Sequence, residues 1–345
     1  MRLLKGSWLV LLLAAVACSK SDNNDKLGNW HKDGSVGSLP AGRILSAGFV
    51  VGDSAYYGTG FDGNVGTTAF WTYEVKNHTW NQIADFTGAP RWAAAAFGAG
   101  GKGYVGTGYD GQYYYNDFYQ YDPKTGAWTR IQDLPGTKRR YATGFGIGDT
   151  GYLTSGQDST PAAKKDFYYL NTSSNTWTKG YGEYNGDPRY GATVFVLNNI
   201  AYFATGMSNS GTTTTDFYAM SPDSLKAGVN PWHKLRDITN SSVDSYDDKY
   251  TTIVRTYGAA FTIGDKGYIA TGQNGGSTQT CWEYDYKTDQ WTQKSDFEGN
   301  ARYGAFGFTL NNHGYIAGGG SSQSTNSLYT DMYWFAPNET LTAND

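Results

Sequence analysis

The 345-residue chain lacks most features of helical, membrane-spanning or disulfide-stabilised proteins. Its only cysteines are Cys18 and Cys281, so at most one disulfide bond could form. It has just 9 prolines, and no apolar run reaches the ~20 residues that a membrane-spanning helix needs. The helix-favouring residues Ala, Leu, Glu and Lys do not dominate either. These absences argue against a helical protein and leave the fold to a hydrophobic core.

Glycine and aromatic residues are abundant instead. The chain contains 46 Gly, 29 Tyr, 16 Phe and 11 Trp, and 16% of its residues are aromatic. Such a content can fill a large core and excludes a disordered chain. The length alone would suit two ordinary domains, although regular all-β architectures of this size often form one.

The first eighteen residues have the pattern of an export signal. Arg2 and Lys5 precede an apolar run of ten residues, 8–17, which is too short to cross a bilayer. Cys18 directly follows the small residues that end this run, which resembles the bacterial lipobox, whose cysteine is lipidated and becomes the mature N-terminus. An ordinary secretory signal cleaved near Ala17 is the alternative. We predict a lipoprotein signal peptide over 1–17 and lipidation of Cys18.

The segment that follows is polar and has no apolar residue before Leu27, which predicts a solvated tether over 18–28. Its Ser and Asp content resembles the surface-export tethers of Bacteroidetes lipoproteins. That resemblance implies an outer-membrane lipoprotein on the periplasmic or cell-surface side, anchored to the lipid bilayer. Loss of the signal removes two basic charges from a net charge of −4, and the resulting −6 disfavours binding to nucleic acid.

A repeat of roughly 50 residues runs through the rest of the chain. A Phe recurs six times at spacings of 48, 48, 50, 66 and 47 residues, so the fourth unit carries an insertion. Each Phe is followed by a Tyr seven residues later and by a Gly eleven residues later. The triplets are Phe49, Tyr56 and Gly60; Phe97, Tyr104 and Gly108; Phe145, Tyr152 and Gly156; Phe195, Tyr202 and Gly206; Phe261, Tyr268 and Gly272; and Phe308, Tyr315 and Gly319.

Each unit predicts four short strands separated by turns that contain Gly or Asp. In the second unit these strands lie within 93–100, 103–108, 117–122 and 128–134. The fourth strand opens with a Trp in five units, at Trp80, Trp128, Trp177, Trp232 and Trp291.

Together these motifs resemble a six-bladed kelch β-propeller, the fold shared by galactose oxidase and the bacterial sialate mutarotases. The resemblance covers about residues 30–336 and implies an all-β fold of four-stranded blades. One departure is visible, because the second strand usually ends in Gly-Gly, which only Gly318-Gly319 keeps. We predict a single propeller domain over 29–338 and a C-terminal tail over 339–345.

The sixth unit lacks a Trp strand of its own, whereas Trp30 lies upstream of the first full unit in a matching context. We therefore predict that the N-terminal segment supplies the outer strand of the last blade. This strand would close the ring and remove an open sheet edge.

An Arg stands six residues before each repeated Phe, where the loop between blades enters the innermost strand. Six guanidinium groups there would surround the channel mouth and could bind carboxylates or sulfates. The alternative is a scaffold role, in which each Arg bonds to backbone carbonyls or stacks on a tyrosine. The six are Arg43, Arg91, Arg139, Arg189, Arg255 and Arg302, and Arg140 offers a competing register in the third blade.

Several aromatic residues lie outside the repeat, on or beside the predicted mouth loops. Exposed Tyr and Trp side chains can stack on sugar rings or anchor a protein partner, and local packing is the alternative. These candidates are Trp92, Tyr109, Tyr113, Tyr114 and Tyr115.

The insertion after the fourth blade holds four carboxylates within 237–250: Asp237, Asp244, Asp247 and Asp248. Their spacing matches no calcium-binding loop, which favours a solvated loop over a calcium site. The four histidines do not converge as a copper site of the galactose oxidase type would require, and no nucleophile elbow or phosphate loop is present. We expect no cofactor, no metal, and a buried Cys281 in place of a core aromatic residue.

The sequence favours a non-catalytic, membrane-anchored kelch propeller that binds a glycan or an outer-membrane or surface protein. Its binding face would consist of the loops between the second and third strands and between successive blades. The alternative is a carbohydrate-active enzyme, sialate mutarotase-like or a lyase, that uses a mouth Arg with a carboxylate. An enzyme should have a deep pocket with an Arg–carboxylate pair of shifted pKa, whereas a binder should have a broad aromatic surface.

Overall fold

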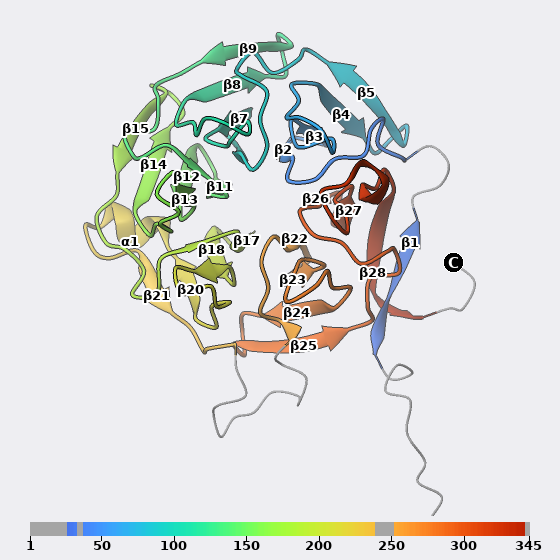
Figure 1. The fold of residues 1–345 in the computed structure, drawn as a ribbon. Helices are drawn as coiled ribbons and strands as arrows, with labels where there is room; N and C mark the ends of the chain where they lie inside the picture. Colours follow the sequence, from blue (N-terminus) through green and yellow to red (C-terminus); the bar gives the residue numbers. More distant parts are fainter. Residues whose placement is uncertain (1–25, 33–36, 239–251, 342–345) are drawn as a thin grey trace, which may run out of the picture.

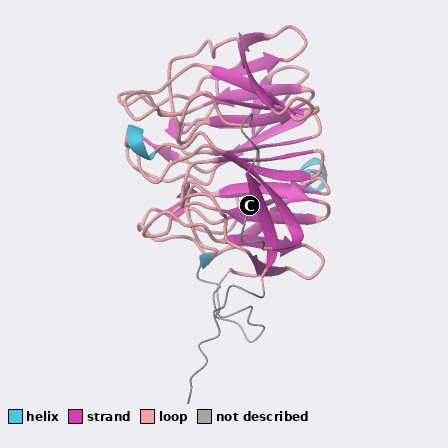
Figure 2. Cartoon of the chain, turned by 90° about the vertical axis from the view of Figure 1, so that its right-hand side faces the viewer, coloured by secondary structure: helices cyan, strands magenta, loops and turns pink. Residues whose placement is uncertain are grey.

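The six sequence units form six four-stranded antiparallel sheets around a central axis in the computed structural model (Figure 1). The structure describes residues 26–32, 37–238 and 252–341. In each blade the first strand lies next to the axis, and the innermost strands of neighbouring blades contact one another. Seen from the side, the strands cross a disc whose connecting loops lie along both edges (Figure 2). The prediction of an all-β, six-bladed propeller is confirmed.

The first three blades are continuous in sequence. Blade 1 consists of β2 (Ala47–Val51), β3 (Ser54–Gly58), β4 (Phe70–Glu74) and β5 (Thr79–Ile83). Blade 2 consists of β6 (Ala95–Ala99), β7 (Lys102–Gly106), β8 (Phe118–Asp122) and β9 (Ala127–Arg130). Blade 3 consists of β11 (Thr143–Ile147), β12 (Thr150–Thr154), β14 (Phe167–Asn171) and β15 (Thr176–Lys179).

The last three blades carry the irregular features. Blade 4 consists of β17 (Thr193–Leu197), β18 (Ile200–Ala204), β20 (Phe217–Met220) and β21 (Trp232–Lys234), with helix α1 (Pro222–Lys226) before its last strand. Blade 5 consists of β22 (Ala259–Ile263), β23 (Lys266–Ala270), β24 (Cys281–Asp285) and β25 (Gln290–Lys294). Blade 6 consists of β26 (Phe306–Leu310), β27 (His313–Ala317), β28 (Met332–Thr340) and β1 (Leu27–Lys32).

Two small sheets and a short helix lie in the mouth loops. β10 (Arg139–Arg140) pairs with β13 (Gln157–Asp158), and β16 (Arg189–Tyr190) pairs with β19 (Met207–Ser208). The 3₁₀ helix η2 (Thr325–Ser327) lies in the corresponding loop of blade 6.

The seven-residue spacing between Phe and Tyr follows from the hairpin that opens each blade. Phe49 and Tyr56 are direct cross-strand partners, and the same pairing recurs in all six blades. Their rings stack with centroids 4.9 to 5.3 Å apart. Such pairs add about 0.5–1.5 kcal/mol each beyond the burial of their area.

The repeated Trp joins one blade to the next. Trp128 of blade 2 packs against Phe49 and Phe70 of blade 1, with ring centroids 6.4 and 5.0 Å apart. Gly103 makes room for this contact, because a Cβ there would stand 2.0 Å from the ring of Phe49. Close packing between blades therefore explains why a Gly precedes the repeated Tyr in blades 2, 3, 5 and 6, and why the small Ala takes this place in blades 1 and 4.

The N-terminal strand closes the ring as predicted. β1 pairs with β28, and Trp30 lies opposite Phe335. Trp30 is completely buried, with its ring edge-on to Phe261 and Phe297. Pairing of Leu27 with Thr340 extends the blade two residues beyond the expected domain limits at each end.

The extra residues of the fourth unit are divided between two places. One part forms α1 in the turn between β20 and β21, and the rest lengthens the loop between blades 4 and 5. Of the four predicted acidic residues, Asp237 pairs with Lys234 at 3.0 Å, whereas Asp244, Asp247 and Asp248 lie outside the described residues. Cys18 and the predicted signal peptide also lie outside them.

Candidate functional site

The channel mouth is encircled by a closed ring of six backbone hydrogen bonds, which we call the collar. In each blade the residue two positions after the repeated Arg donates its N–H to the carbonyl of its counterpart in the neighbouring blade, at 2.8 to 3.1 Å. All six have a positive φ of 54 to 62°. The collar residues are Leu45, Ala93, Tyr141, Gly191, Tyr257 and Gly304. The sequence analysis did not identify these residues. The only signal for their positive φ was the glycine at two of the six positions, Gly191 and Gly304.

A second ring of bonds explains the repeated Gly. The N–H of each of these glycines donates to the carbonyl of the repeated Arg in the next blade, at 2.7 to 2.9 Å. The last bond, from Gly319 to Arg43, joins blade 6 to blade 1. The Arg and Gly repeats are therefore two halves of one contact between blades.

The residue before each repeated Gly adopts a positive φ of 52 to 67°, which is costly for Thr or Ser. A hydroxyl at this position brings a compensating bond. Thr59, Thr107 and Ser155 each accept the first N–H of their blade's innermost strand at 3.2 Å. In these three blades the departure from Gly-Gly thus replaces conformational freedom with a hydrogen-bond acceptor, whereas the buried hydroxyl of Thr271 in blade 5 has no hydrogen-bond partner.

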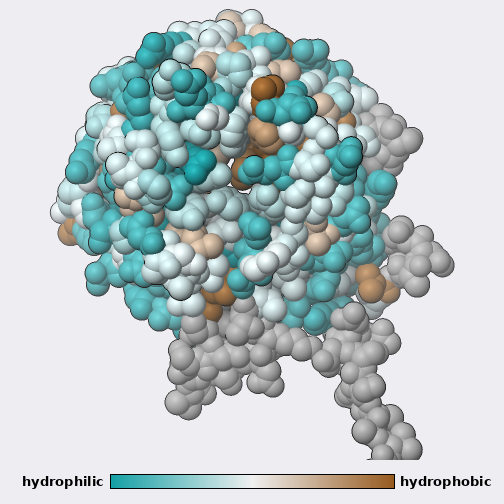
Figure 3. Space-filling model, viewed as in Figure 1, coloured by the Kyte–Doolittle hydropathy of each residue, from teal (hydrophilic) through white to brown (hydrophobic). Residues whose placement is uncertain are grey.

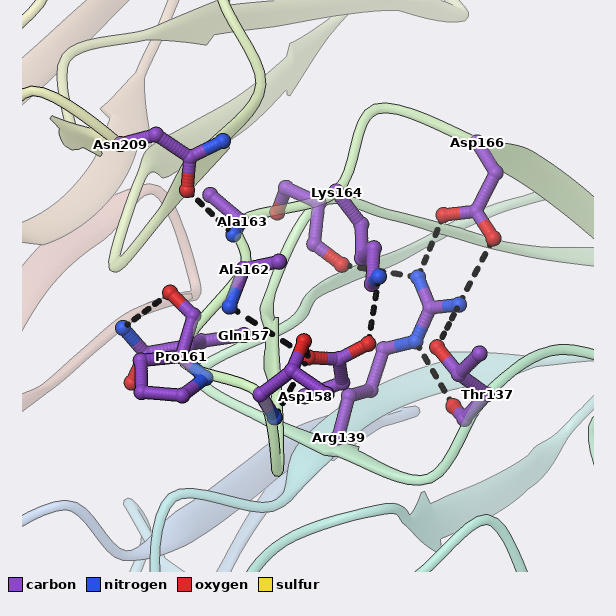
Figure 4. A network of polar contacts seen from close by, with 12 residues as sticks. Thr137, Arg139, Gln157, Asp158, Pro161, Ala162, Ala163, Lys164, Asp166 and Asn209 are labelled. Atoms are coloured by element: carbon purple, nitrogen blue, oxygen red, sulfur yellow. Dashed lines mark hydrogen bonds and ion pairs between the residues drawn. The ribbon is translucent and has the colours of Figure 1, made fainter.

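Arg139 illustrates the setting of the repeated arginines (Figure 4). Its side chain is fully buried, and its two terminal nitrogens bond to the carboxylate of Asp166 at 2.5 and 2.7 Å. It also donates to the carbonyls of Ser155 and Thr137, both at 3.0 Å. Burial alone would raise the pKa of Asp166, but the hydrogen bond and charge of Arg139 outweigh burial and lower it.

The other repeated arginines are held similarly. Four of the six pair with an Asp that precedes the third strand: Arg91 with Asp117, Arg139 with Asp166, Arg189 with Asp216 and Arg302 with Asp331. Arg43 and Arg255 bond to backbone carbonyls and a Thr hydroxyl instead. Burial lowers the pKa of Arg255 to about 10. Because at most 6% of any of these residues is exposed, a ligand in the mouth would not touch their guanidinium groups in this structure.

An aromatic cluster lies above the collar. Trp92 contacts Phe61 and Tyr109, with ring centroids 4.9 and 5.2 Å apart, and Tyr109 contacts Tyr114 at 4.7 Å. Trp92 itself is 9% exposed, whereas Tyr109 and Tyr114 are half-buried. Three of the five predicted aromatic candidates therefore come together at one place.

The remaining two candidates are set apart. Tyr113 is exposed at the tip of its loop. Tyr115 lies over the guanidinium of Arg91 at 4.1 Å and donates its hydroxyl to Asp110. Burial and Asp110 raise the pKa of Tyr115 to about 12.

Arg140 lies among the aromatic rings beside the collar. Its guanidinium is 5.0 Å from the ring centre of Tyr109, 5.4 Å from that of Tyr114 and 4.8 Å from that of Tyr141. It donates to Gln157 at 3.2 Å, and its Nε has no hydrogen-bond partner. Among the described residues it has no ion-pair partner, unlike the neighbouring Arg139. We call Arg140 with Trp92, Tyr109, Tyr114 and Tyr141 the aromatic rim.

The aromatic rim borders the opening of the central channel. A cavity of about 150 Å³ lies at the level of the collar, between Leu45, Ala93, Tyr141 and Tyr257. A second cavity of about 220 Å³ continues below it between small residues of the innermost strands. Figure 3 shows this hollow at the centre of the face, with hydrophobic residues along part of its edge.

Comparisons with known proteins agree with this geometry. A Kelch motif matches residues 108–135, which span the loop of Tyr113–Tyr115 and strands β8 and β9. The chain folds as a kelch-type six-bladed propeller. A solved structure titled "Structure of YjhT" superposes with a TM-score of 0.70 at 19% sequence identity, covering 86% of this chain and 95% of that one. No curated protein matches the sequence. At this identity the likeness concerns the fold.

Two further observations concern metals and membranes. Within the described ranges no three His, Cys, Asp or Glu side chains gather as a metal ion would need, and none of the helices there is long and apolar enough to cross a bilayer. Cys281 is fully buried as predicted, and burial raises the pKa of its thiol.

Proposed function

We propose that this propeller binds a glycan at its aromatic rim. The observation that carries the proposal is the contrast between Arg140 and the repeated arginines. The repeated arginines use their donors within the scaffold, whereas Arg140 lies on three tyrosine rings, donates to Gln157 and has no ion-pair partner among the described residues. Half-buried tyrosines offer flat faces for sugar rings, and Arg140 offers donors for a sugar carboxylate or sulfate.

The proposed cellular setting rests on the leader sequence. Lipidation of Cys18 would hold the propeller at the outer membrane, on its periplasmic or cell-surface side, through a short polar segment. Radiolabelled palmitate incorporation into the full chain, compared with the Cys18→Ala variant, tests the anchor separately from binding.

A glycan array probed with the wild type and two variants tests the binding proposal. We expect Arg140→Ala and Tyr114→Ala to weaken binding by roughly tenfold or more, since a charge-assisted hydrogen bond is worth about 1.5–3 kcal/mol. Arg130→Ala is the matched control, because Arg130 is an exposed Arg on β9 that pairs with Asp133. Binding that survives both rim substitutions, or an array without any bound glycan, would refute the proposal. Capture of a surface protein through the rim would instead support the protein-partner alternative.

The enzymatic alternative requires an accessible cation–carboxylate pair. The Arg–Asp pairs of the scaffold are buried and recur in four blades, so they are poor candidates. The pair between Lys164 and Asp158 lies in the mouth loops at 2.5 Å (Figure 4). Burial would raise the pKa of Asp158, but the bonds from Lys164 and Thr160 outweigh it and lower the pKa to about 2. Such a carboxylate is a weak base at neutral pH, which favours binding. NMR of anomeric exchange in any sugar that binds would reveal mutarotase activity.

A further inference from the structure

Two of the six collar residues are tyrosines, and they lie on either side of one glycine. Gly191 of blade 4 donates its N–H to the carbonyl of Tyr141 in blade 3 at 3.1 Å, and Tyr257 of blade 5 donates to that of Gly191 at 2.9 Å. Tyr141 and Tyr257 have a positive φ of 58 and 54°, which a residue with a large side chain adopts at a cost. Such strain persists only where the surroundings hold the residue in place, and it clusters at binding sites.

The missing side chain of Gly191 lets the ring of Tyr257 reach across blade 4 to blade 3. A Cβ on Gly191 would stand 2.5 Å from Cε1 of Tyr257, which is too close for any real contact. The rings of Tyr257 and Tyr141 meet with their centroids 4.9 Å apart, at an interplanar angle of 52°. Gly304, the other collar glycine, has Ile44 beside it instead. The crossing is therefore specific to Gly191.

Tyr141 also contacts Arg140, its neighbour in sequence. The guanidinium carbon of Arg140 lies 4.8 Å from the ring centre of Tyr141. The other two rings around Arg140, those of Tyr109 and Tyr114, come from the loop between β7 and β8 of blade 2. Tyr141 is therefore the ring that joins Arg140 to the collar. A displacement of Tyr257 would reach Arg140 through the ring of Tyr141.

The tyrosine pair holds Arg140 without neutralising it. Burial raises the pKa of Tyr257, and it raises the pKa of Tyr141 despite the opposing effect of the Arg140 charge. Both hydroxyls are therefore neutral at physiological pH. A neutral ring attracts a cation through its π face but, unlike a carboxylate, leaves its charge in place. Arg140 thus keeps a full positive charge at the mouth while its position is fixed by packing.

We propose that Tyr257 is a positioning residue for the aromatic rim. Its ring holds the ring of Tyr141 against Arg140, and so fixes the guanidinium group in the direction in which it donates to a carboxylate or sulfate of the glycan. Preorganisation of this kind raises affinity, because less side-chain freedom is lost on binding. The role deepens the proposed function and rests on it, since Arg140 is the group through which Tyr257 acts on the ligand.

NMR of the arginine side chains in the full propeller tests the positioning without a ligand. Protein grown with isotope-labelled arginine gives a signal for each Nε–H group, and Arg140→Ala identifies the signal of Arg140. Nε of Arg140 is buried, so its proton exchanges slowly with water, and the tyrosine rings shift its signal through their ring currents. We expect Tyr257→Ala to move this signal toward that of the exposed Arg130. Tyr257→Phe keeps the ring and should leave the signal in place.

Gly191→Ala displaces the ring of Tyr257 without removing it, and should move the same signal. Ala93 shows that alanine can adopt the collar conformation, with a φ of 54°, so the substitution acts through the ring and not through the backbone. Gly304→Ala is the matched control at the other collar glycine, which the ring of Tyr257 does not cross. An Arg140 signal that stays fixed in both Tyr257→Ala and Gly191→Ala would overturn the proposal, as would an equal movement in Gly304→Ala.

A double-mutant cycle on glycan affinity tests whether Tyr257 acts through Arg140. For an array glycan that binds the wild type, Tyr257→Ala should weaken binding roughly two- to fivefold, the usual worth of a cation–π contact, and Tyr257→Phe should have no effect. In the Arg140→Ala background, Tyr257→Ala should cause no further loss. An equal loss in that background would mean that Tyr257 contacts the ligand itself, and would overturn the positioning role.

The two proposals fail in distinguishable ways. An Arg140 signal that moves in Tyr257→Ala, together with an array on which no glycan binds, would support the positioning contact and refute glycan binding at the rim. A fixed signal, together with glycans that are lost in Arg140→Ala, would refute the positioning role and leave the proposed function standing.

Discussion

Arg139 and Arg140 are neighbours in sequence but belong to two different regions of the mouth. Arg139 is fully buried in the ring of repeated residues and bonds to a carboxylate and two backbone carbonyls. Arg140 is part of the aromatic rim, where it contacts three tyrosine rings and, among the residues that the structure describes, has no carboxylate within ion-pair distance. In this face, a residue repeated in every blade serves contacts between and within blades, whereas a binding surface needs the residues that differ between blades.

The largest expected effect separates these two arginines. Arg139→Ala should destabilise the propeller by about 3–5 kcal/mol, because it leaves Asp166 and the buried carbonyls without their donor. Arg140→Ala should cost at most about 1 kcal/mol, the worth of a partly exposed cation–π contact. Urea unfolding followed by tryptophan fluorescence measures both. Similar losses in the two variants would abolish the distinction between ring and rim.

A smaller effect should distinguish arginines within the ring. Within the described part of the chain Arg255 has the carbonyls of Thr271 and Thr280 as partners but no carboxylate, so Arg255→Met removes a buried cation that is held by hydrogen bonds to neutral groups. We expect the free energy of unfolding to fall by about 1–3 kcal/mol, because the buried carbonyls lose their donor. The fall should be smaller than for Arg139→Met, which also leaves the carboxylate of Asp166 without its partner. The same urea experiment ranks the two variants, and the reverse order would show that the Asp adds nothing to the ring.

Acid should act on both regions. The pKa of Asp158 in the mouth loops is about 2 in the folded protein and the pKa of Asp166 is lowered, both from an ordinary 3.8. A carboxylate with a lowered folded pKa stabilises the fold above its unfolded pKa, and this contribution is lost as pH falls through the folded value. We expect the melting temperature to fall between about pH 4 and pH 2. Asp158→Asn should flatten that decline slightly, and an unchanged pH profile would contradict the role of its pair with Lys164.

The smallest effect concerns the collar. Ala93 has a φ of 54°, which an alanine adopts at a cost, whereas Ala95 lies two residues on in β6 with strand geometry. Ala93→Gly relieves that cost, but glycine also gives the unfolded chain more conformational entropy to lose on folding. We therefore expect the free energy of unfolding to change by no more than about 0.5 kcal/mol. Ala95→Gly should destabilise by about 1 kcal/mol. A clear loss in Ala93→Gly would mean that its methyl group, rather than the collar bonds, matters at this position.

Much of the fold could be predicted because it depends on periodic contacts. The spacing from Phe49 to Tyr56 follows from cross-strand pairing in a tight hairpin, and the position of Trp30 predicted the closing strand. The alternatives for the repeated arginines could not be resolved in the same way, because one sequence pattern is compatible with a guanidinium that faces the channel and with one that faces the sheet.

The candidate site was only partly visible in the sequence. Trp92, Tyr109 and Tyr114 were identified from their departure from the repeat, and the structure brings them together. Arg140 was noted only as a competing register for Arg139, since its isolation from carboxylates depends on which loops surround it.

The sequence by itself determined the number of blades, the strands of each blade and the strand that closes the ring. These features rest on spacing along the chain, which hairpin geometry and the alternation of side chains convert directly into structure. Only the tertiary structure decided which arginines are buried and which aromatic rings meet. Those outcomes depend on contacts between side chains of different blades. The distances between such side chains are set by the assembled fold and not by any single segment of the sequence.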